Sequence, residues 1–253
     1  MVTNVRYILL TAFRDWLFLG LMLGVVAAVL ISHVLASTAL VEVQEMNLAF
    51  GAGSARMILA VGLIVFVCFH VRNAFDTKEI DVILSRPISR SNLLLSYWLG
   101  FAAVATVLVI PSLAVLSCVG ILSIKGFFGW ALSLLCESYM VVAIALFAAC
   151  TLRSAVASVM ASLGFYVLSR MMGFFIATTH SHMLENSWID VLSKHITTFI
   201  SMIIPRLDFF AKSEWLIYGM NSFDDMTRVV MQSVIFIPLL LVAAMIDFNR
   251  KQF

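Results

Sequence analysis

Charged residues are scarce in this sequence. They make up 12% of 253 residues, against about 25% in a typical soluble domain. The formal net charge is only +2, which offers no basic surface for nucleic acid. Hydrophobic residues make up 62% and lie in long runs, without the alternating segments of about 10 residues that a β-barrel needs. The composition therefore predicts an all-α, polytopic membrane protein in contact with lipid.

Motifs that carry chemistry are also missing. The sequence has no G-x-x-x-x-G-K-[ST] loop to hold a nucleotide phosphate, no H-E-x-x-H and no G-x-S-x-G. Its few cysteines form no C-x-x-C pair and fall in apolar runs, which is typical of small buried side chains: Cys68, Cys118, Cys136 and Cys150. We expect neither a cofactor in this chain nor an enzyme activity of its own.

Six apolar runs predict membrane spans, each of which needs about 20 residues. We place them at residues 16–41, 57–71, 93–124, 127–152, 155–179 and 229–246. The second run is short, so we expect Arg56 to snorkel at one of its ends. The third contains Pro111, which predicts a kink or tilt, and ends at Lys125. No repeat or linker divides the chain, which indicates a single transmembrane domain over residues 1–253.

Two segments outside the spans have helical periodicity. Residues Thr3–Asp15 predict an amphipathic helix that lies at the membrane surface. The long segment 180–228 carries an apolar stripe at residues 188, 192, 196, 199 and 203, which predicts an amphipathic or shallow re-entrant helix ended by Pro205.

The distribution of Lys and Arg predicts the orientation, because short cytoplasmic loops are enriched in both. Nine lie on the side of the termini: Arg6, Arg14, Arg72, Lys78, Arg86, Arg90, Arg153, Arg250 and Lys251. Six lie on the other side, four of them in segment 180–228: Arg56, Lys125, Lys194, Arg206, Lys212 and Arg228. We therefore expect both termini in the cytoplasm and segment 180–228 outside it.

A charged stretch, Phe75–Arg90, separates spans two and three on the cytoplasmic side. Asp76 is placed to cap a short helix, with Glu79 three residues later to complete a capping box. Pro87 lacks an N–H and ends that helix. The stretch is either an ordinary solvated loop or a docking element on which a cytoplasmic partner acts, and we favour the docking element.

The pattern resembles the permease subunits of ABC exporters of the type-2 export class, closest in style to the branch that serves nitrous oxide reductase maturation. The resemblance covers nearly the whole chain through its topology. At residue level it rests on Glu79 with the Leu-Ser-Arg-Pro-Ile-Ser-Arg stretch at 84–90, on the Ile-Pro-Arg-Leu-Asp-Phe-Phe stretch at 204–210, on Arg14–Asp15 and on the basic tail 248–253.

The resemblance implies a half-transporter in a bacterial cytoplasmic (inner) membrane. It would pair with a second permease copy or homologue and be driven by separate cytoplasmic ABC ATPase subunits, which bind ATP and Mg. The implied coupling residues are Phe75, Glu79, Ile80, Asp81, Ile83, Arg86, Pro87 and Arg90. The apolar ones would fill a slot on the ATPase, and Glu79 and Arg86 would fix the register. Alternatives are an intramembrane enzyme acting on lipid or peptide, and a non-transporting scaffold or sensor.

Glu137 and Arg170 are the only formally charged residues inside the predicted spans. A charge there costs about 3 kcal/mol or more, so it normally faces a partner or a cavity. The two lie at matching depth, about 15 Å below the outer surface at 1.5 Å per residue. We favour a structural ion pair over a substrate or proton site. His180, His182 and Glu185 have a spacing that suits a metal, but we favour an exposed loop start.

Overall fold

The computed structural model describes residues 2–14, 16–38, 42–80, 89–181, 188–210, 212–220 and 223–250. In these ranges the chain is helical and contains no strand. Its elements are α1 (Val2–Arg14), α2 (Trp16–Ala36), α3 (Val43–Asp76), α5 (Arg90–Ser117), α6 (Ile124–Thr151), α7 (Ala155–Ser181), α8 (Trp188–Ile203), the 3-10 helix η1 (Leu207–Phe210), α9 (Glu214–Tyr218) and α10 (Phe223–Arg250).

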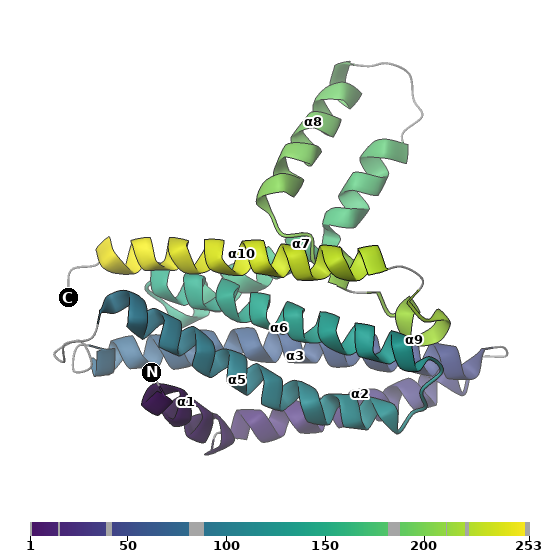
Figure 1. The fold of residues 1–253 in the computed structure, drawn as a ribbon, viewed down its shortest axis with the longest axis horizontal. Coiled ribbons are helices and arrows are strands. Elements are labelled where there is room, and N and C mark those ends of the chain that lie inside the picture. Colours follow the sequence, from purple (N-terminus) through teal and green to yellow (C-terminus); the bar gives the residue numbers. More distant parts are fainter. Residues whose placement is uncertain are drawn as a thin grey trace.

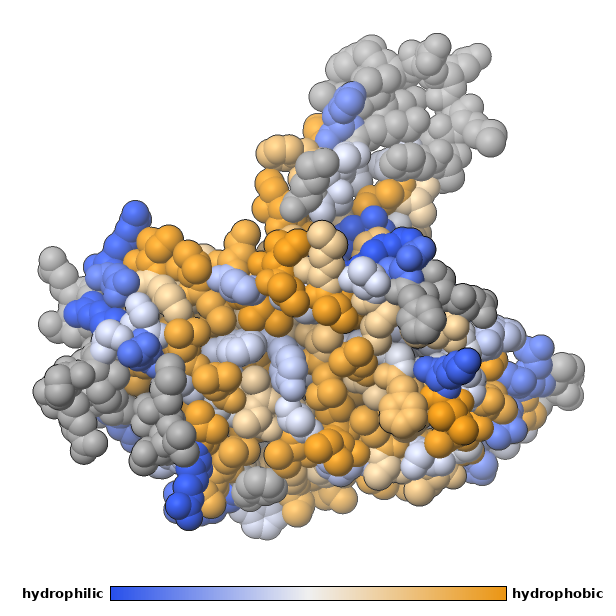
Figure 2. Space-filling view, viewed as in Figure 1, coloured by the Kyte–Doolittle hydropathy of each residue, from blue (hydrophilic) through white to orange (hydrophobic). Residues whose placement is uncertain are grey.

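Six of these helices are long and apolar enough to cross a membrane: α2, α3, α5, α6, α7 and α10. This confirms the prediction of an all-helical, multi-pass architecture. Figure 1 shows α3, α5, α6 and α10 running along one bundle, with both termini at the same end. Figure 2 shows hydrophobic side chains over the middle of this bundle and hydrophilic ones gathered toward its ends.

Helix α6 is the centre of the bundle. It packs against α3, α5, α7 and α10, and nearly every side chain from Met140 to Ala145 is fully buried. A helix that is apolar all round belongs in such a position. Helices α2, α7 and α10 lie outside it and expose large apolar side chains such as Leu30, Phe174 and Leu239. Exposed apolar side chains on such helices are typical of a surface that contacts lipid.

The second span is much longer than the sequence pattern predicts. Helix α3 has 34 residues and includes residues 43–56, which lie before the predicted span 57–71. Its first turns bury Leu48, Ala52 and Ala55 at helical spacing against the bundle. Small side chains there allow close packing, although their mean hydropathy is modest.

Other boundaries also shift. Helix α2 ends at Ala36, and α5 ends at Ser117 after continuing through Pro111. Ser123 then caps α6, where its hydroxyl accepts from the Gly126 amide. Lys125 therefore lies in the first turn of α6 and does not end the third span, as we had predicted.

Helix α1 covers nearly the range predicted for the amphipathic N-terminal helix. It packs mainly on α5, where Ile8 is buried and lies against Gly100. A Cβ at position 100 would lie 2.6 Å from Ile8 Cδ1, so the glycine allows this approach. The position of α1 at a membrane surface stays a prediction.

Segment 180–228 contains the end of α7, then α8, η1, α9 and the start of α10. Helix α8 spans the predicted apolar stripe and exposes Ile196, Phe199 and Ile203. Figure 1 shows α8 and the adjoining part of α7 projecting from the bundle as a hairpin. The 3-10 helix η1 at its base packs against α6, α7 and α10.

We predict that the bundle end carrying the termini is cytoplasmic. Cys118 is exposed at the end of α5, so the test uses a Cys118→Ser background. An impermeant maleimide added to intact cells should label Glu214→Cys, and should label Thr77→Cys only after the membrane is opened. Both positions are exposed. The reverse labelling pattern would overturn the orientation.

Candidate functional site

A buried ion cluster lies in the middle of the bundle, centred on Glu137 of α6. The Glu137 side chain is 2% exposed. Arg56 of α3 places Nη1 2.5 Å from Glu137 Oε2, and Arg170 of α7 places Nη1 3.1 Å from Oε1. The hydroxyl of Tyr166, one turn before Arg170, also donates to Oε1 at 2.9 Å. Three membrane-spanning helices are therefore joined at one carboxylate.

Arg56 extends the cluster to the 3-10 helix. Its Nη1 donates to the carbonyl oxygen of Phe210 at 2.6 Å, and its Nη2 donates to Ser133 Oγ at 3.0 Å. The Ser133 hydroxyl lies 3.2 Å from the same carbonyl. The guanidinium carbon lies 4.9 Å from the centre of the Trp130 ring, within cation–π range. The cluster thus fixes η1 against α3 and α6.

The helices bring these charges to one depth. Arg56 is 13 residues from the start of α3 and Glu137 is 13 from the start of α6, while Arg170 is 11 before the end of α7. At 1.5 Å per residue these distances are about 17–20 Å. Arg170 and Glu137, which we had paired by depth, are in direct contact.

The expectation for Arg56 was wrong. We predicted that it would snorkel at the end of a short span, whereas it is 1% exposed and bound to Glu137. The physical reason is that α3 begins well before Met57, so Arg56 lies deep inside the bundle. The small and apolar residues that precede it at helical spacing were the signal that could have identified it.

The cluster contains two cations and one carboxylate and carries a net positive charge. In a low-dielectric interior each charge is costly unless its hydrogen-bonding capacity is met. Arg56 and Glu137 meet this condition with several partners each. The Arg170 side chain is 23% exposed, so the excess charge lies at the edge of the cluster. This arrangement suits a contact that holds α3, α6 and α7 in one relative position.

A second group of contacts gathers α3, α5 and α10 at the terminus end of the bundle. Ile80 and Leu93 are buried with Phe248 of α10. The Phe75 ring lies 6.1 Å from the Phe248 ring, edge to face. Arg90 donates to the Phe248 carbonyl oxygen at 3.3 Å. We call Phe75, Ile80, Leu93, Arg90 and Phe248 the junction.

The junction corrects two expectations for the charged stretch. Asp76 was predicted to cap a new helix, but it is the last residue of α3 and pairs with Arg72 one turn earlier. Ile80 was predicted to enter a slot on an ATPase, but it is 3% exposed and packs within the chain. The physical reason is that an apolar side chain just after a helix end packs into the nearest apolar space. For Ile80 this space lies between Leu93 of α5 and Phe248 of α10.

The remaining predicted residues have different outcomes. Glu79 is exposed beside the junction. Asp81, Ile83, Arg86 and Pro87 lie outside the described residues, as do His182 and Glu185, and of His180 only the backbone is described, near the end of α7. The described residues contain no group of three or more His, Cys, Asp or Glu side chains arranged to hold a metal ion.

Comparison of the sequence with protein-family models and with curated proteins finds no match. The functional argument therefore rests on the geometry of the cluster and of the junction.

We predict an order of destabilisation within the cluster. Glu137→Gln and Arg56→Gln should each lower the free energy of unfolding in detergent by about 3–5 kcal/mol, because each leaves buried charge without its partner. Arg170→Gln should cost less, because it is partly exposed and leaves the Arg56–Glu137 pair intact. Lys125→Gln, at an exposed cation outside the cluster, is the control and should have little effect.

A double-mutant cycle of Arg56→Gln and Glu137→Gln isolates the interaction itself. The two losses should not add, with a coupling free energy of about 1–3 kcal/mol. Strict additivity would contradict the contact.

Proposed function

We propose that the chain is the membrane-spanning permease subunit of an ATP-driven ABC exporter. It works in a bacterial cytoplasmic membrane with a second permease copy or homologue. Separate cytoplasmic ATPase subunits bind ATP and Mg and act on the charged stretch 75–90. The observation that supports this proposal best is the junction, because it fastens both ends of the charged stretch to three helices at once.

Helix α3 supplies a path from this stretch into the membrane. It is one helix from Val43 to Asp76 and passes through Arg56, which lies 20 residues before its cytoplasmic end, or about 30 Å. Arg72 also donates to the Leu152 carbonyl oxygen at 3.3 Å, which ties α3 to the turn between α6 and α7. A displacement at the junction would therefore reach the ion cluster through a stiff element.

Burial within the junction limits which residues of the charged stretch an ATPase could contact. Ile80 is buried and Phe75 is partly buried in the junction, so the ATPase would bind the polar side of the stretch, beginning at Glu79. Charge-assisted hydrogen bonds to such a carboxylate are short and directional. They suit an interface that transmits force.

We predict that Glu79→Ala weakens ATPase association. The measurement is co-purification of the tagged chain with an ATPase subunit that carries the G-x-x-x-x-G-K-[ST] loop, followed by MgATP hydrolysis in proteoliposomes. Loss of one charge-assisted hydrogen bond should reduce retained ATPase about tenfold. The chain's own thermal unfolding should not change, because Glu79 is exposed.

Glu214→Ala is the matched control. It removes an exposed carboxylate from α9, which Figure 1 shows at the end of the bundle away from the termini. Equal ATPase retention in the parent and in both variants would count against docking at Glu79. Absence of any co-purifying ATPase from the parent would favour the scaffold or enzyme alternatives.

A further inference from the structure

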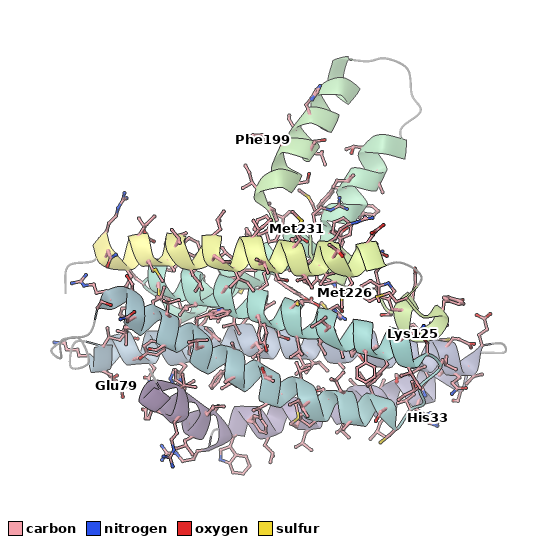
Figure 3. All side chains as sticks on the ribbon, in the orientation of Figure 1. His33, Glu79, Lys125, Phe199, Met226 and Met231 are labelled. Carbon is pink, nitrogen blue, oxygen red and sulfur yellow. The ribbon has the colours of Figure 1, made fainter. Side chains whose placement is uncertain are left out.

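A polar cavity of about 460 Å³ lies at the terminus end of the molecule, between α1 and α3. Helix α1 packs on α5 and α2, and the cavity separates it from α3. Figure 3 places Glu79, at the rim of the cavity, at one end of the bundle, with His33 and Lys125 at the other. The cavity is separate from the ion cluster and does not depend on the transport function.

Two matching rows of side chains line the cavity. Tyr7, Thr11 and Arg14 follow the spacing i, i+4, i+7 on α1, and Phe66, His70 and Asn73 follow the same spacing on α3. Residues so spaced share one face of a helix. The buried Ile8 and Ala12 lie on a neighbouring face of α1 and hold the helix against the protein. The fold therefore builds the cavity between two helices.

The lining changes character along α3. Phe66 and Phe69 line the cavity at the positions on α3 farthest from Glu79, and Phe69 is 49% exposed. The His70 ring contacts the rings of Phe66 and Phe101, which also contact each other. Asn73 and Glu79 follow toward the end of the helix. Phe66 is 10 residues before Asp76, or about 15 Å deep, so the gradient from apolar to charged matches a phospholipid and its headgroup.

The cavity also holds one charge of each sign. Arg14 and Glu79 both line it, yet within the described ranges neither forms an ion pair with another residue. A guanidinium matches a phosphate, and a carboxylate in a lining that also carries the Tyr7 and Thr11 hydroxyls matches an ammonium that donates three hydrogen bonds. A ligand with both groups would satisfy both residues.

We propose that this cavity binds the phosphoethanolamine headgroup of a membrane phospholipid. Arg14 and Asn73 hold the phosphate, Glu79 holds the primary ammonium, and the acyl chains leave past Phe69. A choline headgroup cannot donate hydrogen bonds to Glu79, and a glycerol headgroup brings no cation. Ethanolamine lipid is therefore the preferred ligand.

The test titrates the delipidated full chain with dioleoyl lipids that carry ethanolamine, choline or glycerol headgroups, and counts bound lipid by native mass spectrometry. The parent should bind ethanolamine lipid about tenfold more tightly than choline lipid, the effect of one charge-assisted contact. Arg14→Gln should weaken all three lipids about tenfold for the same reason. Glu79→Gln should remove the preference for ethanolamine.

Arg6→Gln is the matched control, because Arg6 is an exposed arginine on the same helix that does not line the cavity; its lipid binding should equal the parent's. If Arg14→Gln does not fold, Asn73→Asp at an exposed position replaces it and should also weaken phosphate binding.

Three outcomes would overturn the proposal. They are equal binding of the three lipids by the parent, equal loss in Arg6→Gln and Arg14→Gln, and displacement of the lipid by soluble phosphoethanolamine at the same concentration as the lipid itself. The last outcome would show that a free phosphate compound, and not a lipid, is the ligand. ATPase retention in Arg14→Gln should match the parent's, which separates this proposal from the docking role of Glu79.

Discussion

The rest of the bundle depends on the carboxylate of Glu137. It lies at mid-depth in the central helix and joins α3, α7 and, through Arg56, the 3-10 helix η1. Buried charges of this kind add little net stability compared with apolar packing, but they penalise any arrangement that separates them. The cluster therefore specifies how these helices meet. Because Arg170 is partly exposed, the Arg170–Glu137 pair separates at lower cost than the buried Arg56–Glu137 pair.

Helix α3 connects this ion cluster to the surface of the protein. One end carries the junction, where Phe75 and Ile80 meet residues of α5 and α10, and the interior carries Arg56. An α-helix transmits displacement along its axis because each backbone group is hydrogen-bonded to the next turn. The proposed transport cycle uses this property: force applied at the charged stretch would change the fit of α3 at Glu137. The cavity beside α1 adds a lipid contact to the same end of α3.

The helical architecture and the depth of Glu137 and Arg170 could be predicted from hydropathy and spacing alone. The role of Arg56 could not, because a charge lowers local hydropathy and so moves the predicted end of the span to Met57. The Phe210 carbonyl that Arg56 binds belongs to a short 3-10 turn, whose position depends on tertiary packing. Similarly, Ile80 looked like a surface contact because its neighbours are charged. Its burial depends on Phe248, which is 168 residues away in the chain.

The central claim is that a dimer of this chain is driven through α3 by ATP. A spin label on Thr77→Cys in a Cys118→Ser, Cys136→Ser background leaves only the buried Cys68 and Cys150 beside the label site. It places one label per copy, just beyond the end of α3. Its inter-copy distance can be measured in nanodiscs with the ATPase bound to ADP and then trapped with ATP and vanadate. The account predicts a well-defined distance that shifts between the two nucleotide states. A distance that is the same in both states, or no inter-copy distance, would contradict it.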